Sequence, residues 1–200
     1  MTIVDRLLEH SFVYRAWQQP FAERKLAPIV ATGDIPRARR VLDVGCGPGT
    51  NAPHFEHVDY IGVDINADYI ANASRRFARR FIVADVTTWT PEAEGRFDFI
   101  LLNSLLHHLA TGDVRALLSH LGGLLTEDGH IHILDLVLPQ KLSISRALAR
   151  ADRGDYPRPL EQWRAIFSDI LDVEHLEPYS LGVGGVTLWN MVYCKARSKR

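Results

Sequence analysis

From position 40 onward, short apolar runs alternate with stretches in which apolar residues recur every three or four positions. Each run is rich in β-branched or aromatic residues and is bounded by turn residues, which is typical of strands. The runs cover residues 41–44, 60–64, 81–85, 97–103 and 130–135. This alternation predicts an α/β fold with a parallel sheet covered by helices.

Two helices are expected between these strands. Apolar residues at helical spacing follow Asp113 and stop before Gly129, which predicts a helix between them. Residues 67–80 form a second helical pattern, and its outer face carries Arg75, Arg76, Arg79 and Arg80. We interpret that arginine cluster as a solvated helix face.

The two ends of the chain lie outside the alternation. Residues 1–38 predict one or two helices, and residues 139–171 predict two more, over 142–150 and 160–171. Strand-like runs at 173–179 and 187–195 flank a glycine-rich turn and predict a hairpin. One domain is expected, with an N-terminal helical lid (1–38), a cofactor-binding core (39–138), a helical insert (139–171) and a terminal hairpin (172–196).

Composition argues against several classes of function but does not identify the function of the protein. The 200 residues include 23 basic and 24 acidic side chains, a balance that argues against a nucleic-acid partner. Two cysteines cannot form a disulfide framework or a structural zinc site by themselves. The N-terminus does not resemble a signal peptide, and no run reaches ~18 apolar residues, so we expect a cytoplasmic protein without a membrane span.

A glycine-rich loop directly follows the first strand, in the segment VLDVGCGPGT at residues 41–50. Glycines at a strand end let the backbone turn tightly and approach a ligand closely. A dinucleotide fingerprint would have Gly or Ala where this chain has Thr50, which disfavours a nicotinamide dehydrogenase.

Polar residues end several of the predicted strands. Asp64 lies 19 residues beyond Gly45, where an acidic side chain can accept hydrogen bonds from two ribose hydroxyls. Asp85 follows 21 residues later. Because ligands bind at the carboxyl ends of parallel strands, Asp43, Asp64, Asp85 and Asn103 are expected to face one cleft. Alternatively, each Asp caps the helix that follows it.

The segments VLDVGCGPG, YIGVDI, FIVADV, FDFILLNSLLHHL and LLTEDGHIHILD resemble the class I S-adenosylmethionine-dependent methyltransferases of small molecules, over about residues 40–138. The resemblance implies a Rossmann-like, doubly wound sheet of seven strands in the order 3-2-1-4-5-7-6, with the last strand antiparallel. It also implies N-terminal helices, a helical insert after the fifth strand and S-adenosylmethionine as the cofactor.

The resemblance further assigns roles to individual residues. Gly45, Cys46 and Gly47 would hold the methionine part of the cofactor, with Asp43 fixing their loop and Tyr14 reaching the cofactor carboxylate. Asp64 would bind the ribose, and Ile65 would pack on the adenine. Asp85 and the Val86 backbone would bind the adenine amine. Asn103 and Ser104 would lie near the methionine amine and the sulfonium.

Two histidines follow the fourth strand and are candidates for a base. His107 and His108 should border the open cleft, where one of them could accept a proton from the acceptor or orient it. The alternative is that one packs against the domain and the other caps a turn. No cluster of potential ligands has metal-site spacing, so no metal is expected.

The acceptor is expected to be a small, apolar metabolite methylated on O, N or C. Aromatic residues in both flanking segments could form a lid over it, or could instead hold the helices on the sheet. They are Tyr14, Trp17, Phe21, Tyr156, Trp163 and Phe167. Arginines of the insert could meet an acidic substrate group or lie on the surface. A non-catalytic scaffold that binds S-adenosylmethionine is the alternative function, and a monomer or homodimer is expected.

Overall fold

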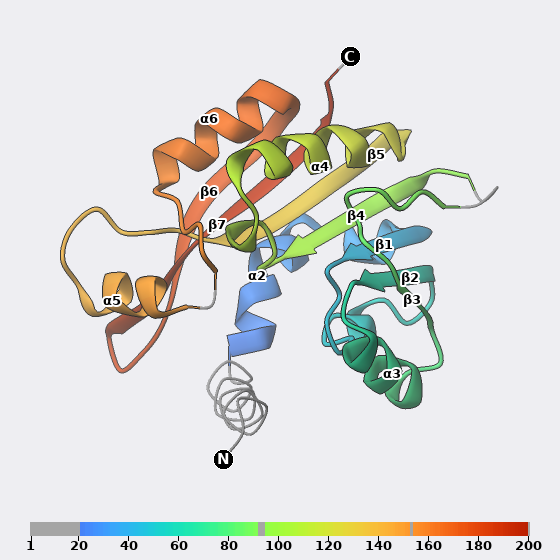
Figure 1. Ribbon diagram of the computed structural model, residues 1–200, viewed down its shortest axis with the longest axis horizontal. Coiled ribbons are helices and arrows are strands. Elements are labelled where there is room, and N and C mark those ends of the chain that lie inside the picture. Colours follow the sequence, from blue (N-terminus) through green and yellow to red (C-terminus); the bar gives the residue numbers. More distant parts are fainter. Residues whose placement is uncertain (1–20, 92–94, 153, 200) are drawn as a thin grey trace.

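A single sheet of seven strands forms the centre of the molecule (Figure 1). The computed structural model describes residues 21–91, 95–152 and 154–199. The strands are β1 (Arg40–Val44), β2 (Asp59–Asp64), β3 (Arg80–Val83), β4 (Phe97–Asn103), β5 (Leu125–Leu136), β6 (Leu171–Val183) and β7 (Val186–Ser198). Their order is β3-β2-β1-β4-β5-β7-β6, and β7 runs antiparallel to both of its neighbours. The predicted order and the antiparallel last strand are confirmed.

Helices cover both faces of this sheet, because successive strand residues point to opposite faces. On one face, Leu42 and Val44 pack in a core shared with α4 (Thr111–Gly123) and α6 (Leu160–Ile170). On the other face, Val41 packs with Leu26 and Ile29 of α2 (Ala22–Thr32). The remaining helices are α3 (Ala67–Arg76) and α5 (Ile144–Ala151). The pattern-based prediction of a sheet covered by helices is therefore correct.

Several element boundaries differ from the predicted ones. The fourth helix ends at Gly123 rather than near residue 128, and Leu125 begins β5 by pairing with Phe97 of β4. Leu125 fits the helical spacing, but two consecutive glycines weaken the helix before it. The third helix ends at Arg76 because Phe77 is extended. Strand β3 ends at Val83, so Asp85 lies in the following loop and not at the strand end.

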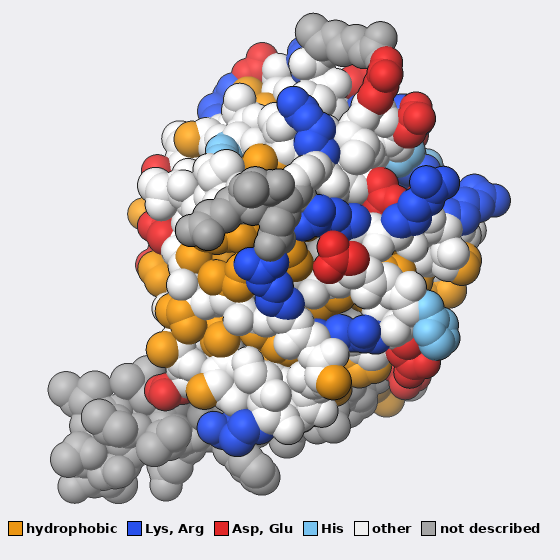
Figure 2. Space-filling model, turned by 90° about the vertical axis from the view of Figure 1, so that its right-hand side faces the viewer, with side chains coloured by type: hydrophobic (Ala, Val, Ile, Leu, Met, Phe, Trp, Pro, Cys, Tyr) orange, Lys and Arg blue, Asp and Glu red, His pale blue; other side chains and the backbone are white. Residues whose placement is uncertain are grey.

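The interpretation of the arginine cluster as one helix face holds for two of its four members, because Arg79 lies in the loop after α3 and Arg80 begins β3. Arg75 and Arg76 are exposed in the last turn of α3. Figure 2 shows that basic side chains on the β3 side of the molecule are interspersed with acidic and apolar ones. Within the described ranges, no helix has the length and apolar character needed to cross a membrane.

Candidate functional site

The loop after β1 is held against β2 on one side and is open on the other. Gly45 and Gly47 have φ angles of 69° and 53°, which glycine adopts without strain. The Gly45 amide donates to the Val63 carbonyl at 2.8 Å, and a Cβ at Gly45 would lie 2.9 Å from the Leu105 side chain. A Cβ at Gly47 would meet none of the described atoms within 4 Å. The loop therefore presents its backbone to open space at Gly47.

Asp64 ends β2 beside this open space. Its Oδ2 accepts from the Gly47 amide and its Oδ1 from the Asn66 amide, each at 2.8 Å. Each carboxylate oxygen has a further lone pair, so Asp64 can still accept two hydroxyl donors. The neighbouring Ile65 side chain is 72% exposed and offers an apolar surface for a ring to pack on. The acceptor oxygens of Asp64 and the apolar side chain of Ile65 fit the ribose hydroxyls and the adenine ring of a nucleoside.

The expectation that Asp43 and Asp64 face the same cleft is wrong for Asp43, which points into the protein interior. Its side chain is fully buried and accepts hydrogen bonds from Tyr60 at 2.6 Å and from Asn51 at 3.1 Å. Burial raises the pKa of Asp43 to about 6, although these two donors oppose the shift. Asp43 thus holds Asn51, which follows the glycine loop in the chain, and its role in fixing that loop for the cofactor stays a prediction.

A line of polar side chains continues from Asn51 across the sheet. Asn103, the last residue of β4, donates to the Asn51 carbonyl at 3.1 Å. The Ser104 hydroxyl donates to Asn103 at 3.3 Å, and the Lys25 ammonium donates to that hydroxyl at 3.1 Å. Ser104 has a φ of 58°, the one positive value outside glycine among the described residues. Backbone strain of this kind concentrates at functional sites.

Asp85 occupies an exposed loop and caps a turn. Its carboxylate accepts from the Thr87 amide at 2.9 Å and from the Thr87 hydroxyl at 2.7 Å. These hydrogen bonds hold the pKa of Asp85 below its usual value. The placement at the end of the third strand was wrong, because the strand stops two residues earlier. Asp85 and the half-buried Val86 remain on the loop beyond β3, at the same edge of the sheet as Asp64.

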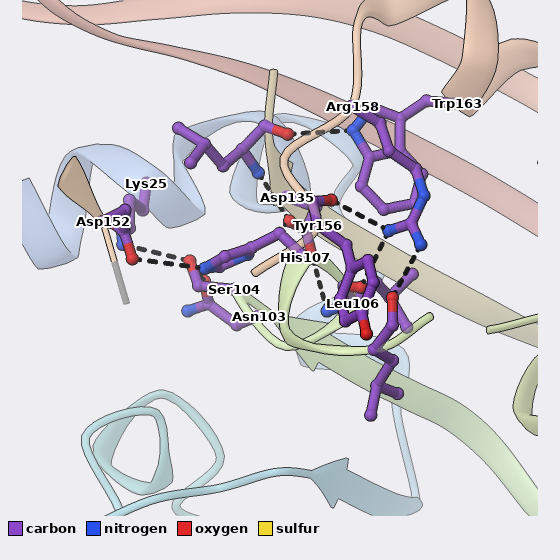
Figure 3. A network of polar contacts seen from close by, with 12 residues as sticks. Lys25, Asn103, Ser104, Leu106, His107, Asp135, Asp152, Tyr156, Arg158 and Trp163 are labelled. Atoms are coloured by element: carbon purple, nitrogen blue, oxygen red, sulfur yellow. Dashed lines mark hydrogen bonds and ion pairs between the residues drawn. The ribbon is translucent and has the colours of Figure 1, made fainter. Parts of the chain in front are cut away.

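His107 is held between two carboxylates and is only 2% exposed (Figure 3). Its Nδ1 donates to Asp135 at 2.7 Å, and its Nε2 lies 3.5 Å from Asp152. Burial lowers the pKa of His107, but Asp135 and Asp152 outweigh that effect and raise it to about 9. The imidazole is therefore protonated near neutral pH, with Nδ1 hydrogen-bonded to Asp135 and Nε2 in a longer ion pair with Asp152 that is not a hydrogen bond. This burial favours the alternative that His107 packs against the domain, and its use as a base stays an untested prediction.

His108 differs from its neighbour in charge and exposure. Its side chain is exposed, and its ring centre lies 4.2 Å from that of His107. Partial burial of the ring and the nearby charge of His107 lower the pKa of His108. Of the two histidines, His108 is the one that remains neutral and able to accept a proton near pH 7.

The loop after α5 packs closely over His107. The Tyr156 amide donates to the His107 carbonyl at 3.0 Å, and a Cβ on Gly154 would lie 2.1 Å from the His107 ring. Arg158, which is 3% exposed, donates to the carbonyls of Leu106 and Leu109 at 3.1 and 2.6 Å. These hydrogen bonds hold the insert against the turn that follows β4.

The fold also gathers possible metal ligands that the sequence spacing separates. One ligand atom from each of His107, His108 and Asp152 lies within 4.8 Å of the others. The proton held by His107 and the nearby Lys25 charge both oppose a divalent cation at this position. The absence of a metal remains a prediction.

Sequence reasoning missed three buried or half-buried charged residues around this site, namely Lys25, Asp135 and Asp152. Arg158 was among the insert arginines expected to meet an acidic substrate group or to lie on the surface, but it is buried against the turn after β4. Lys25 carried one available signal, since it falls between the apolar positions of Phe21 and Ile29 at four-residue spacing. The others depend on tertiary contacts between distant segments.

Most of the expected aromatic lid is core or lies outside the described residues. Trp163 and Phe167 are fully buried and stack at 5.3 Å, and Phe21 is also buried. These three hold helices on the sheet, which was the alternative interpretation. Tyr156 is 45% exposed. Tyr14 and Trp17 fall outside the described residues.

Comparisons with known proteins agree with this architecture. An uncharacterized methyltransferase of Mycobacterium tuberculosis is 39% identical over 104 residues, which cover 50% of this chain and 51% of that protein. A trans-aconitate 2-methyltransferase of Methylobacterium radiotolerans is 34% identical over 152 residues, covering 73% and 54% respectively. The chain thus spans about half the length of these relatives.

A solved structure shares the fold. The magnesium protoporphyrin IX methyltransferase of Synechocystis PCC 6803, with bound S-adenosylmethionine, superimposes with a TM-score of 0.64 at 20% identity. The match covers 92% of this chain and 82% of that one. The methyltransferase domain family itself matches residues 14–181. This chain therefore belongs to the methyltransferase domain family.

Proposed function

We propose that this protein transfers a methyl group from S-adenosylmethionine to O, N or C of a small molecule. The observation that carries the proposal is the pairing of Asp64 with the open backbone at Gly47. These residues lie where β1 separates the β2–β3 side of the sheet from the β4–β5 side. In open α/β sheets this switch point is where nucleotide ligands bind.

Different residues around this point bind different parts of the cofactor. Asp64 accepts the ribose hydroxyls, and Ile65 packs on one face of the adenine. Asp85 and the Val86 backbone bind the adenine amine. The methionine part lies along the loop of Gly45, Cys46 and Gly47, toward Asn103 and Ser104. Tyr14 of the N-terminal segment binds the cofactor carboxylate.

Little acid–base chemistry is demanded of the protein. The cofactor supplies an activated methyl group, so the protein has to align the acceptor and exclude water. The Ser104 backbone is held at the end of β4 by a 2.7 Å hydrogen bond to Leu134, which fixes this edge of the site. His107 ties that edge to the insert, and His108 is the base available for an acceptor that must lose a proton.

The acceptor lies over the carboxyl ends of β4 and β5, between α2 and the loop of residues 152–158. A small molecule is supported by the relatives named for trans-aconitate methylation. The apolar acceptor expected from the sequence loses its main support, because Trp163 and Phe167 belong to the core. Charged side chains surround the site instead.

Calorimetric titration with S-adenosylhomocysteine, the demethylated cofactor, tests the proposal. Asp64→Ala should weaken binding by about 10- to 100-fold, because hydrogen bonds to a charged group contribute ~1.5–3 kcal/mol. Asp59→Ala, at the opposite end of the same strand, should bind like the wild type. Absence of binding by the wild type would contradict the proposal.

A labelled methyl donor separates an enzyme from a non-catalytic scaffold. Transfer of labelled methyl to any small molecule in a metabolite extract supports the enzyme. Tight S-adenosylhomocysteine binding without transfer supports the scaffold. Hydride transfer with a nicotinamide cofactor, without S-adenosylhomocysteine binding, would point to a dehydrogenase.

A further inference from the structure

Ser104 has a backbone conformation that its surroundings must hold in place. Its φ of 58° lies in the left-handed region, which residues with a Cβ rarely adopt. Such a conformation persists only where neighbouring contacts determine it. The Ser104 amide donates to the Leu134 carbonyl of β5 at 2.7 Å, which restrains the backbone before Ser104. The contacts that restrain the backbone after it come from the next residue of β5, Asp135.

Asp135 binds the turn that follows Ser104. It is fully buried near the end of β5, where its backbone pairs with Val192 of β7. Its Oδ2 accepts from the Leu106 amide at 2.7 Å, and its Oδ1 accepts from His107 Nδ1 at the same distance (Figure 3). Hydrogen bonds to a carboxylate are shorter and stronger than those between neutral groups. Asp135 therefore holds two consecutive residues of the turn from a fixed point in the sheet.

The turn held by Asp135 adjoins the residues proposed to bind the cofactor. The Leu105 side chain lies against the glycine loop, since a Cβ at Gly45 would be 2.9 Å from Leu105 Cδ1. Asn103, directly before Ser104, is the last residue of β4. A shift of the turn would therefore change both the packing against the glycine loop and the backbone at the end of β4.

We infer that Asp135 is a positioning residue for the cofactor, because it holds the turn after β4 and so keeps Ser104 in its strained conformation. The inference rests on the proposed function, which places the methionine part of S-adenosylmethionine beside Ser104. Asp135 is buried behind the turn, so it acts on the cofactor through the turn and not by contact. Without its carboxylate, the Ser104 backbone would relax to an unstrained conformation, and the cofactor would meet a less ordered site.

Calorimetric titration with S-adenosylhomocysteine tests the inference. Asp135→Ala removes both hydrogen bonds and should weaken binding about tenfold. Asp135→Asn keeps an oxygen that can accept from the Leu106 amide, so its affinity should stay within about threefold of the wild type. The matched control is Asp98→Ala, which should bind like the wild type, because Asp98 accepts from the Arg39 and Arg40 amides at the opposite end of β4. Equal affinity of Asp135→Ala and the wild type would overturn the inference.

The Ser104→Gly background separates a positioning role from a general loss of structure. Glycine adopts a φ of 58° without strain, so the conformation of the turn depends less on Asp135 in this background. Asp135→Ala should then weaken S-adenosylhomocysteine by no more than about twofold, against about tenfold with Ser104 present. Each comparison is made within one background, because Ser104→Gly also removes a hydroxyl. A similar loss in both backgrounds would show that Asp135 does not act through Ser104 and would overturn the inference.

Hydrogen exchange gives a second readout, which does not require Asp135→Ala to fold. Because the cofactor and Asp135 favour the same conformation of the turn, cofactor binding must restrain the turn in return. In Asp135→Asn, S-adenosylhomocysteine should slow exchange of the Leu106 amide more than that of the Phe97 amide, which is hydrogen-bonded to Leu124 at the start of β4. Equal slowing of both amides, or none, would contradict the inference. Failure of the wild type to bind S-adenosylhomocysteine would instead refute the proposed function.

Discussion

At the scale of single residues, His107 shows how the environment of a side chain decides its role. The sequence places it next to the cleft, where a histidine usually exchanges protons. The fold places Asp135 on one side of its ring and Asp152 near the other, which holds a proton on it. The same residue type at the next position, His108, is left neutral and exposed.

The raised pKa of His107 makes stability depend on pH. Its stabilising contribution is fully present below the unfolded pKa of about 6.5 and is lost as the pH rises through about 9. The difference in unfolding free energy between wild type and His107→Gln should therefore shrink by about 3 kcal/mol between pH 6 and pH 10. Urea denaturation at several pH values measures this, with the exposed His57→Gln as the control. Parallel curves for wild type and His107→Gln would refute the assignment.

Gly47 and Gly33 form a matched pair for testing the cofactor loop. Both have positive φ angles, 53° and 69°, and in the described part of the chain no atom lies within 4 Å of a Cβ at either. Alanine at each should cost a similar ~1–2 kcal/mol of stability through backbone strain. Only Gly47→Ala should also weaken S-adenosylhomocysteine, because its Cβ would project into the space beside Asp64. Calorimetry and urea denaturation separate the effects, and an equal loss of affinity in both variants would contradict the placement.

The sequence could predict Asp64 and the glycine loop because they depend on strand ends and local spacing. It could not predict that Asp43 turns inward, since this depends on hydrogen bonds that Tyr60 and Asn51 both donate to its carboxylate. The sequence also could not predict the ion pair between Asp152 and His107. These residues are 45 positions apart and come together only when the insert packs against the turn after β4. Lys25 was detectable in principle as a charge on an apolar helix face.

At the scale of elements, the pattern predicted that the strands exist, the family resemblance implied their order, and the boundaries were predicted less well. Each parallel strand is a short apolar run that the chain shows locally. The limits of β5 depend instead on pairing with β4 and β7, so its first residues still resembled the helix before it. The two long strands of the hairpin extend beyond their apolar runs because they pair with each other for most of their length.

The contact between the insert and the turn after β4 can be tested with a second pair of glycines. Gly154→Ala should destabilise the protein by about 1–3 kcal/mol, because its Cβ would lie 2.1 Å from the His107 ring and 2.7 Å from the His107 carbonyl. Gly112→Ala, in α4 with no atom near, should instead stabilise it by about 0.5–1 kcal/mol. Hydrogen exchange at the Tyr156 amide should quicken only in Gly154→Ala. Unchanged exchange there would show that the loop does not depend on this close packing.

At the scale of the whole molecule, the sheet separates two tasks. The loops after β1, β2 and β3 carry the residues proposed to bind the cofactor. The elements proposed to meet the acceptor are α2, the turn after β4 and the loop after α5, which come from distant parts of the chain. Local sequence patterns describe the first set well, whereas the second set exists only once the chain has folded.

The line of hydrogen bonds from Asp43 through Asn51, Asn103 and Ser104 to Lys25 joins these two regions. Both proposed ligands would lie beside this line, the cofactor at the glycine loop next to Asn51 and the acceptor near Ser104 at the end of β4. Filling one site would therefore order groups that the other site uses. By linkage, each ligand should then raise the affinity for its partner by the same factor, so that the enzyme would favour the complete ternary complex over either half-filled one.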